Sequence, residues 1–215
     1  GVLRGLLSWR GLAVWLVILA YLAGAAYWTR HEALDRLSDK AVRVLSPFAE
    51  QGQSSLSNYL WDWQGPAVYL LEHGHRDPAL LRVLLLTEAR RVNEGTYLYD
   101  ACWNWDLREP LIERCGQAYP TDPLVAWASG RLLLIAGEYS PAADEFLLAK
   151  ELNFDPDQAG VSWIHERGRL VTALLMAGRL DEADSLLKGE MTAAPEELKP
   201  VCDYADFLCG IQRYP

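Results

Sequence analysis

Few side chains in this sequence are spaced in a way that could support chemistry. His73 and His75 are two residues apart, a spacing that directs them to different sides of a helix. Gly74 and the Asp77-Pro78 pair indicate that a helix ends here. A metal ion bound by these histidines would need carboxylates from elsewhere, so capping or solvation of the helix end is the simpler interpretation.

The familiar catalytic motifs do not occur. There is no glycine-rich phosphate loop, no Gly-x-Ser-x-Gly turn and no His-Glu-x-x-His zinc motif. Acidic residues such as Glu88, Glu94 and Asp100 are scattered, and catalysis by paired carboxylates needs a geometry that this spacing does not indicate. We therefore expect a protein that is not an enzyme, with no catalytic residue, metal ion, cofactor or small-molecule substrate.

The four cysteines leave two interpretations open. Cys102 and Cys115 would lie near the two arms of one helical hairpin and could form a disulfide, as in an oxidising compartment. Cys202 and Cys209 are about 10 Å apart along a helix, too far for a disulfide unless the helix breaks between them. Alternatively, all four are small apolar core residues.

Two Trp-x-Trp motifs, at 61–63 and 103–105, stand 42 residues apart. Tryptophans at positions i and i+2 cannot share one helical face, so they could pack at the turns between helices. On the surface they could instead contact a partner or a glycan, and Trp103 and Trp105 are candidates for that role.

These motifs belong to a longer repeat. Dipeptides ending in proline at 77–78, 122–123, 155–156 and 194–195 fall 45, 33 and 39 residues apart, within the range of helical repeats. Proline stops one helix and suits the first turn of the next. Because no long segment alternates polar and apolar residues with period two, we expect an all-α fold without a sheet.

Residues 123–156 resemble a tetratricopeptide repeat (TPR), and residues 157–195 repeat the pattern with Val171 and Glu190 in place of two small residues. The matching positions are the turns 137–139 and 178–180 and the helical residues Gly130, Leu133, Ala142, Phe146, Ala149, Ala183 and Leu187. The resemblance implies an α-α superhelix of stacked hairpins whose concave face, lined by the first helix of each pair, binds other proteins.

Four arginines on the expected first helices are candidate partner-binding residues. They could hold an acidic or C-terminal peptide, although each could equally be a solvated surface residue: Arg82, Arg90, Arg131 and Arg167. The net charge of −9 argues against nucleic acid as a partner.

Residues 11–28 contain no charged side chain and lie between Arg10 and Arg30. As a helix they would span about 27 Å, close to the hydrocarbon thickness of a bilayer. A secretory signal peptide cleaved at 23–25 is the alternative, but the run is longer than is usual for one. We therefore expect a transmembrane helix that includes Gly11, Trp15, Tyr21, Gly24 and Trp28.

The expected organisation is a membrane anchor at 1–29, an amphipathic juxtamembrane helix at 30–50 and a TPR-like domain at 51–215. The juxtamembrane helix would pack on its own domain or against a partner's helix, and Ser46-Pro47 together with the polar run at 50–55 predicts its end. The domain would hold about four hairpins, ending near 78, 123, 156 and 195, and a capping helix at 196–212.

These expectations describe a single-pass protein of a bacterial inner membrane with its soluble domain in the periplasm. Its partners would be the lipid bilayer and other membrane or envelope proteins. It would be a scaffold or adaptor that assembles or stabilises an envelope membrane complex. The alternatives are a permanent non-catalytic accessory subunit of a large membrane complex and an enzyme or glycan-binding module with a Trp-lined groove.

Overall fold

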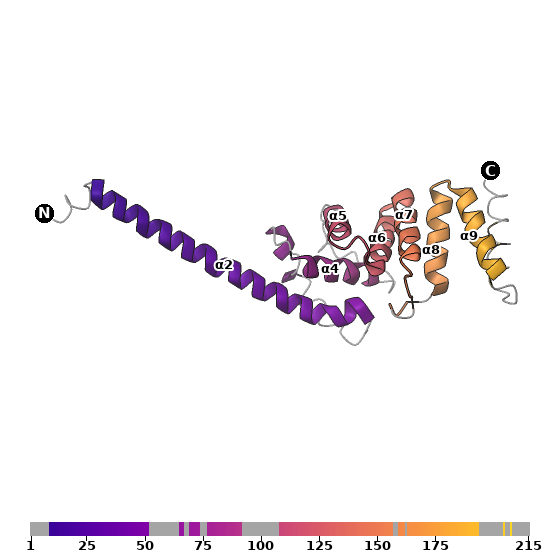
Figure 1. Ribbon diagram of the computed structural model, residues 1–215, viewed down its shortest axis with the longest axis horizontal. Helices are drawn as coiled ribbons and strands as arrows, with labels where there is room; N and C mark the ends of the chain where they lie inside the picture. The colour runs from indigo at the N-terminus through magenta and orange to yellow at the C-terminus, as the bar shows by residue number, and fades with distance from the viewer. Residues whose placement is uncertain are drawn as a thin grey trace.

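The chain folds into helices that are arranged along one long axis (Figure 1). The computed structural model describes residues 9–51, 65–66, 69–73, 77–91, 108–156, 159–161, 163–193, 204 and 207. Within those residues, the side chains of 9–13, 51, 91, 108–110 and 163–165 are also left out of the description. All the regular structure in the described part is helical, so the predicted all-α class is confirmed.

The principal helices are α2 (Trp9–Gln51), α4 (Pro78–Arg91), α5 (Arg108–Ala118), α6 (Pro123–Ala136), α7 (Tyr139–Glu151), α8 (Trp163–Met176) and α9 (Leu180–Ala193). Helix α2 packs on α4, and α4 packs on α6. From α6 onward each helix packs on the next, so that α6 to α9 stand side by side (Figure 1).

Helix α2 runs without a break through the boundary that was expected at residue 29 and through Pro47. Pro47 itself does not break the helix, and the end expected near residue 50 lies one residue before the last residue of α2, Gln51. Proline removes one backbone donor and is costly in the middle of a helix. Here it lies four residues from the end, and the guanidinium of Arg90 holds the carbonyl groups of Ala49 and Glu50 that follow it.

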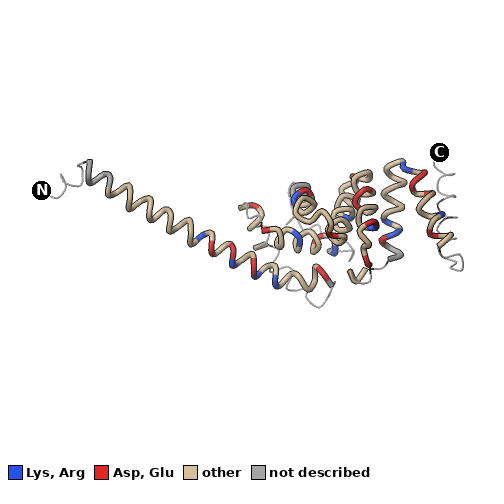
Figure 2. The backbone as a smooth tube through the Cα atoms, in the orientation of Figure 1, with Lys and Arg blue, Asp and Glu red and all other residues tan. Residues whose placement is uncertain are grey.

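The two halves of α2 have different surroundings. Residues 14–28 are exposed, including Tyr21 and Trp28, whose exposed fractions are 76% and 72%. From Leu34 onward one face enters the core, where Ala41 and Phe48 are buried. In the coloured part of α2 in Figure 2, the charged residues follow the exposed apolar stretch 14–28, and Arg30 is the first of them in the sequence. In the part of the chain that the structure describes, no helix combines the length and the apolar character needed to cross a membrane.

Helix α4 is buried on nearly every side, as expected of an interior helix in a stack. It lies between α2 and α6 and also contacts α5. Its buried apolar residues are Leu80, Leu81, Val83, Leu84, Leu85, Leu86 and Ala89. This burial of a whole helix surface stabilises the junction between α2 and the stack.

The ends of α6 follow from local sequence. Asp122 caps the N-terminus by accepting hydrogen bonds from the backbone N–H groups of Leu124 and Val125, and Pro123 fills the first turn. Gly137 ends the helix with a φ of 81°, a left-handed conformation that favours glycine. The expected boundaries near 78 and 123 therefore coincide with the starts of α4 and α6.

Gly130 lets α7 approach α6 closely, as its place in the sequence pattern predicted. A Cβ atom at this position would lie 3.0 Å from the ring of Phe146 on α7. Such a contact is shorter than side chains tolerate without moving, so the aromatic ring occupies the space that the glycine leaves.

The C-terminal part of the prediction lies mostly outside the described residues. The boundary near 156 precedes α8, which begins at Trp163, and the boundary near 195 follows the end of α9. Of the capping helix expected at 196–212, Tyr204 and Phe207 are described. Both are helical, and Phe207 is buried.

Candidate functional site

The predicted site residues fall into three groups. The membrane residues Trp15, Tyr21, Gly24 and Trp28 lie on the exposed half of α2, and Gly11 lies in its first turns. The four candidate partner-binding arginines lie on α4, α6 and α8. Of the remaining four predicted residues, Cys115 lies on α5, and Trp103, Trp105 and Cys102 lie outside the described part of the chain.

The first polar contact between α2 and the stack is made by Ser38. Its hydroxyl donates a hydrogen bond of 2.8 Å to the Asp77 carboxylate, although the two residues are 39 apart in the chain. The other carboxylate oxygen of Asp77 accepts from the backbone N–H of Ala79 at the start of α4. One carboxylate thus caps α4 and joins it to α2.

Arg90 clamps the C-terminal end of α2. Its guanidinium donates to the carbonyl oxygens of Ala49, at 2.6 Å, and Glu50, at 2.8 Å, and also to that of Ala159. The last carbonyl groups of a helix have no partner within the helix and carry a partial negative charge, so a cation here is favourable. Burial lowers the pKa of Arg90, and the charge of Glu166 opposes this change.

Arg82 makes a second internal connection. It donates 2.6 Å and 2.9 Å hydrogen bonds to the carboxylates of Asp122 and Glu50, which joins the end of α2 to the N-cap of α6. Burial acts to lower the pKa of Arg82, but these two carboxylates outweigh it and raise the pKa. Arg82 and Arg90 therefore hold α2 against the stack. Their partners are 32 to 69 residues away in the chain, so no local sequence signal indicates this role.

Arg131 lies at the centre of a second cluster of charged and aromatic side chains, which no sequence pattern predicted. It is 1% exposed, and its guanidinium carbon is 5.0 Å from the centre of the Trp127 ring. Its Nη1 atom lies 3.8 Å from Oε1 of Glu166, on α8, which is ion-pair distance. The guanidinium nitrogens Nε, Nη1 and Nη2 have no hydrogen-bond acceptor in the described structure.

Glu166 is already engaged by two other groups. Its Oε2 accepts a 2.9 Å hydrogen bond from the Trp127 indole, and its Oε1 accepts one from Arg169. Burial lowers the pKa of Arg131 to about 10. The charge of Glu166 opposes this change, and those of Arg169 and Arg90 add to it. Helices α4, α6 and α8 each contribute at least one of these charged groups.

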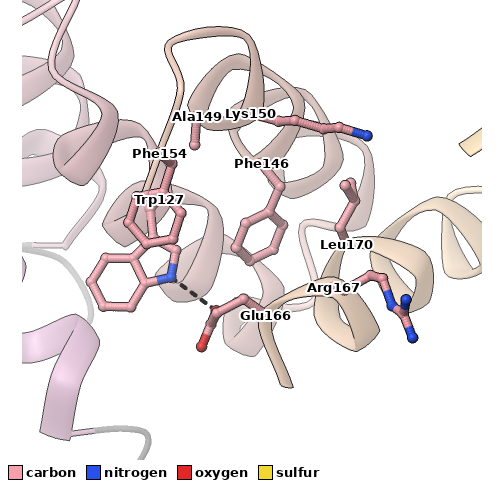
Figure 3. Close-up of a pocket in the computed structure, with 8 residues that line it drawn as sticks. All are labelled: Trp127, Phe146, Ala149, Lys150, Phe154, Glu166, Arg167 and Leu170. Atoms are coloured by element: carbon pink, nitrogen blue, oxygen red, sulfur yellow. Dashed lines mark hydrogen bonds between the residues drawn. The ribbon is translucent and has the colours of Figure 1, made fainter. Parts of the chain in front are cut away.

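A small apolar pocket lies beside this cluster (Figure 3). It measures about 60 Å³ and has Trp127 and Glu166 in its wall. Trp127 stacks on Phe154 with ring centres 5.4 Å apart. The side chains of Lys150 and Arg167 extend outward from the rim (Figure 3). The other lining residues are Phe146, Ala149 and Leu170. The pocket could accept a small apolar side chain or a few carbon atoms.

Arg167, the fourth candidate arginine, donates a 3.1 Å hydrogen bond to Glu190 on α9. Its side chain is 8% exposed and joins two helices of the stack. Each of the four candidate arginines is thus buried or held by contacts within the chain, so none is a freely solvated handle.

Cys115 is a buried free thiol, and burial raises its pKa to about 12. The disulfide expected with Cys102 concerns a residue outside the described ones. Among the described residues, no three ligating side chains gather in a way that would hold a metal ion.

Comparison with protein-family models, with curated proteins and with solved structures gives no match.

Proposed function

We propose that this chain is a non-enzymatic scaffold or adaptor, anchored in a membrane by the first half of α2, with a TPR-like stack that binds other proteins. The observation that carries the proposal is the contrast within α2. One continuous helix is exposed and uncharged over residues 14–28, and from Leu34 onward one of its faces is buried against the stack.

Exposure of the first half of α2 to water is energetically unfavourable. Large apolar side chains cover all sides of it: Val14, Trp15, Leu16, Val17, Ile18, Leu19, Tyr21, Leu22, Tyr27 and Trp28 are each at least 41% exposed. A helix that is apolar all round is typical of a protein core or a lipid environment. A lipid bilayer can contact every face of such a helix at once. The proposed anchor also takes in residues 11–13, whose side chains lie outside the described ones.

The stack supplies rigidity and surface. In the proposed arrangement it stands at a fixed angle to the bilayer, because Ser38, Arg82 and Arg90 connect α2 to three other parts of the fold. The partners would be other membrane or envelope proteins. The proposed location is a bacterial inner membrane with the stack on the periplasmic side.

A permanent accessory subunit of a large membrane complex is the second candidate. Gly24, Ala25 and Ala26 form a small surface on the exposed half of α2, and a Cβ atom at Gly24 would meet nothing within 4 Å. Small surfaces of this kind allow transmembrane helices to approach closely. Purification in mild detergent separates the two candidates, since a permanent subunit co-elutes with its complex in fixed ratio and an adaptor does not.

The anchor is tested by extracting membranes at alkaline pH from cells that express the chain. Wild type should remain in the pellet. The double variant Ile18→Arg, Leu19→Arg should be released, because each arginine costs about 2.5–3.5 kcal/mol at the centre of a membrane helix. Leu180→Arg on α9 is the matched control, since Leu180 is 45% exposed. Release of wild type to the same extent as the double variant would refute the anchor.

A further inference from the structure

The Arg131 guanidinium is buried without the hydrogen bonds that such a group needs. Buried charged groups are almost always paired, because burial removes the water that would otherwise solvate them. Arg131 is 1% exposed, yet three of its nitrogens have no acceptor in the described residues. Its contact with the Trp127 ring offsets only part of this loss.

The charged groups near Arg131 do not satisfy it. Among the described residues, the guanidinium groups of Arg90 and Arg169 and the carboxylate of Glu166 act on its charge. Arg90 is satisfied by three carbonyl oxygens, and Glu166 already accepts from Trp127 and Arg169. Arg131 therefore carries a positive charge and unused donors in a buried position, which is the opposite of what packing alone would favour.

We propose that Arg131 binds a carboxylate group between α6 and α8, on the side where Arg169 lies. A carboxylate accepts two parallel hydrogen bonds from one guanidinium and carries the negative charge that Arg131 lacks at hydrogen-bond distance. The apolar pocket that shares Trp127 and Glu166 would accept the few carbon atoms attached to the carboxylate. The ligand is either a small free carboxylic acid or an acidic group of a partner protein. Only the second source rests on the proposed function.

Entry to the site is possible from the Arg169 side. Arg169 has a side chain that is 26% exposed, whereas Arg131 is enclosed. Helix α8 packs chiefly on α7 and α9 and has less contact with α6. A shift of α8 away from α6 opens the space between the two arginines, and the bound carboxylate then holds the helices together.

The test is thermal unfolding of the full chain in mild detergent, with sodium acetate compared with sodium chloride at equal ionic strength. Acetate should raise the Tm of wild type by about 2–4 °C. It should have no such effect on Arg131→Met. Arg36→Met, which removes an exposed arginine of α2, is the matched control and should respond as wild type does. If Arg131→Met does not fold, Arg169→Met replaces it and should show a reduced shift.

Two peptides distinguish the sources of the carboxylate. Acetyl-Ala-Asp-Ala-amide offers a side-chain carboxylate, and acetyl-Ala-Asn-Ala-amide is its neutral counterpart. A response to acetate alone supports a free acid as the ligand, and a stronger response to the aspartate peptide supports an acidic group of a partner. The absence of any shift, or equal shifts in wild type and Arg131→Met, overturns the proposal. Because the acetate measurement does not involve a membrane, it stands even if the proposed anchor fails.

Discussion

Two buried arginines in this chain should respond in opposite ways to the same substitution. Arg90 donates to three carbonyl oxygens, of Ala49, Glu50 and Ala159. Arg131 has three nitrogens without an acceptor in the described structure. Both are at least 95% buried, so a difference between the two variants would come from hydrogen bonding and charge rather than from exposure.

The expected loss of stability in Arg90→Met follows from the carbonyl groups that lose their hydrogen-bond donor. Each buried carbonyl that loses its donor costs about 1–3 kcal/mol, so those of Ala49 and Ala159 together cost at least about 2 kcal/mol, and the part-buried carbonyl of Glu50 adds to this. Methionine keeps much of the apolar stem of the side chain, which limits the loss of packing. We expect Arg90→Met to lower the free energy of unfolding by about 3–5 kcal/mol.

For Arg131→Met we expect no loss of stability, in contrast to Arg90→Met. The substitution removes a poorly compensated buried charge, while Glu166 keeps its hydrogen bonds from Trp127 and Arg169. Replacement of poorly compensated buried charges by apolar side chains is often neutral, or stabilising by about 1–4 kcal/mol. In buffer without carboxylates, we expect Arg131→Met to be at least as stable as wild type.

Urea unfolding in mild detergent, followed by far-UV circular dichroism, measures both variants. A change in the midpoint with an unchanged slope reports a change in stability. Arg36→Met is the control for loss of an exposed charge, since its pair with Glu32 is solvated and should contribute less than about 1 kcal/mol. If Arg90→Met and Arg131→Met lose the same amount of stability, the distinction drawn here between a satisfied and an unsatisfied guanidinium is wrong.

Three further predictions concern the stack. Gly130→Leu should destabilise the chain by about 1–3 kcal/mol, because the new side chain meets the Phe146 ring; Gly189→Leu, where a Cβ meets nothing within 4 Å, is the control, and equal losses in urea unfolding would contradict the close contact. Hydrogen bonds from Lys188 and Tyr204 lower the pKa of Asp184, so its contribution to stability is present above the unfolded pKa of about 4 and is lost as the pH falls through the folded value. Asp184→Asn should therefore weaken the pH dependence of the melting temperature in acid, and an unchanged profile would exclude this role. The Cys115 thiol, with a pKa of about 12, should resist iodoacetamide at pH 8 until urea unfolds the chain; rapid labelling of the native chain, seen by mass spectrometry, would contradict its burial.

The sequence predicted those parts of the fold that depend on local patterns. The absence of period-two alternation gave the helical class, and the proline-containing boundaries near 78 and 123 match the starts of α4 and α6. Gly130 was identified by its spacing, and its contact with Phe146 confirms the reason for a small residue there.

Contacts between distant residues could not be predicted in this way. Pro47 and the polar residues after it indicated where a helix ends, but they gave no sign that Arg90, 43 positions beyond Pro47, holds carbonyl groups of its last turn. Arg82 and Arg90 were interpreted as handles for a partner, and their acceptors instead lie within the chain. Nothing in the spacing of Arg131 and Glu166 indicated that they would meet, because side-chain pairing across helices depends on tertiary packing.

The most direct test of the proposed membrane anchor is the rate of backbone hydrogen exchange at residues 14–28. This rate can be compared between the full chain in lipid nanodiscs and the full chain in a polymer that keeps it soluble without lipid. A bilayer withholds water from the backbone, so we expect residues 14–28 to exchange far more slowly in nanodiscs, while α6 and α7 exchange equally in both. Rapid and equal exchange of residues 14–28 in both conditions would contradict a membrane-anchored stack.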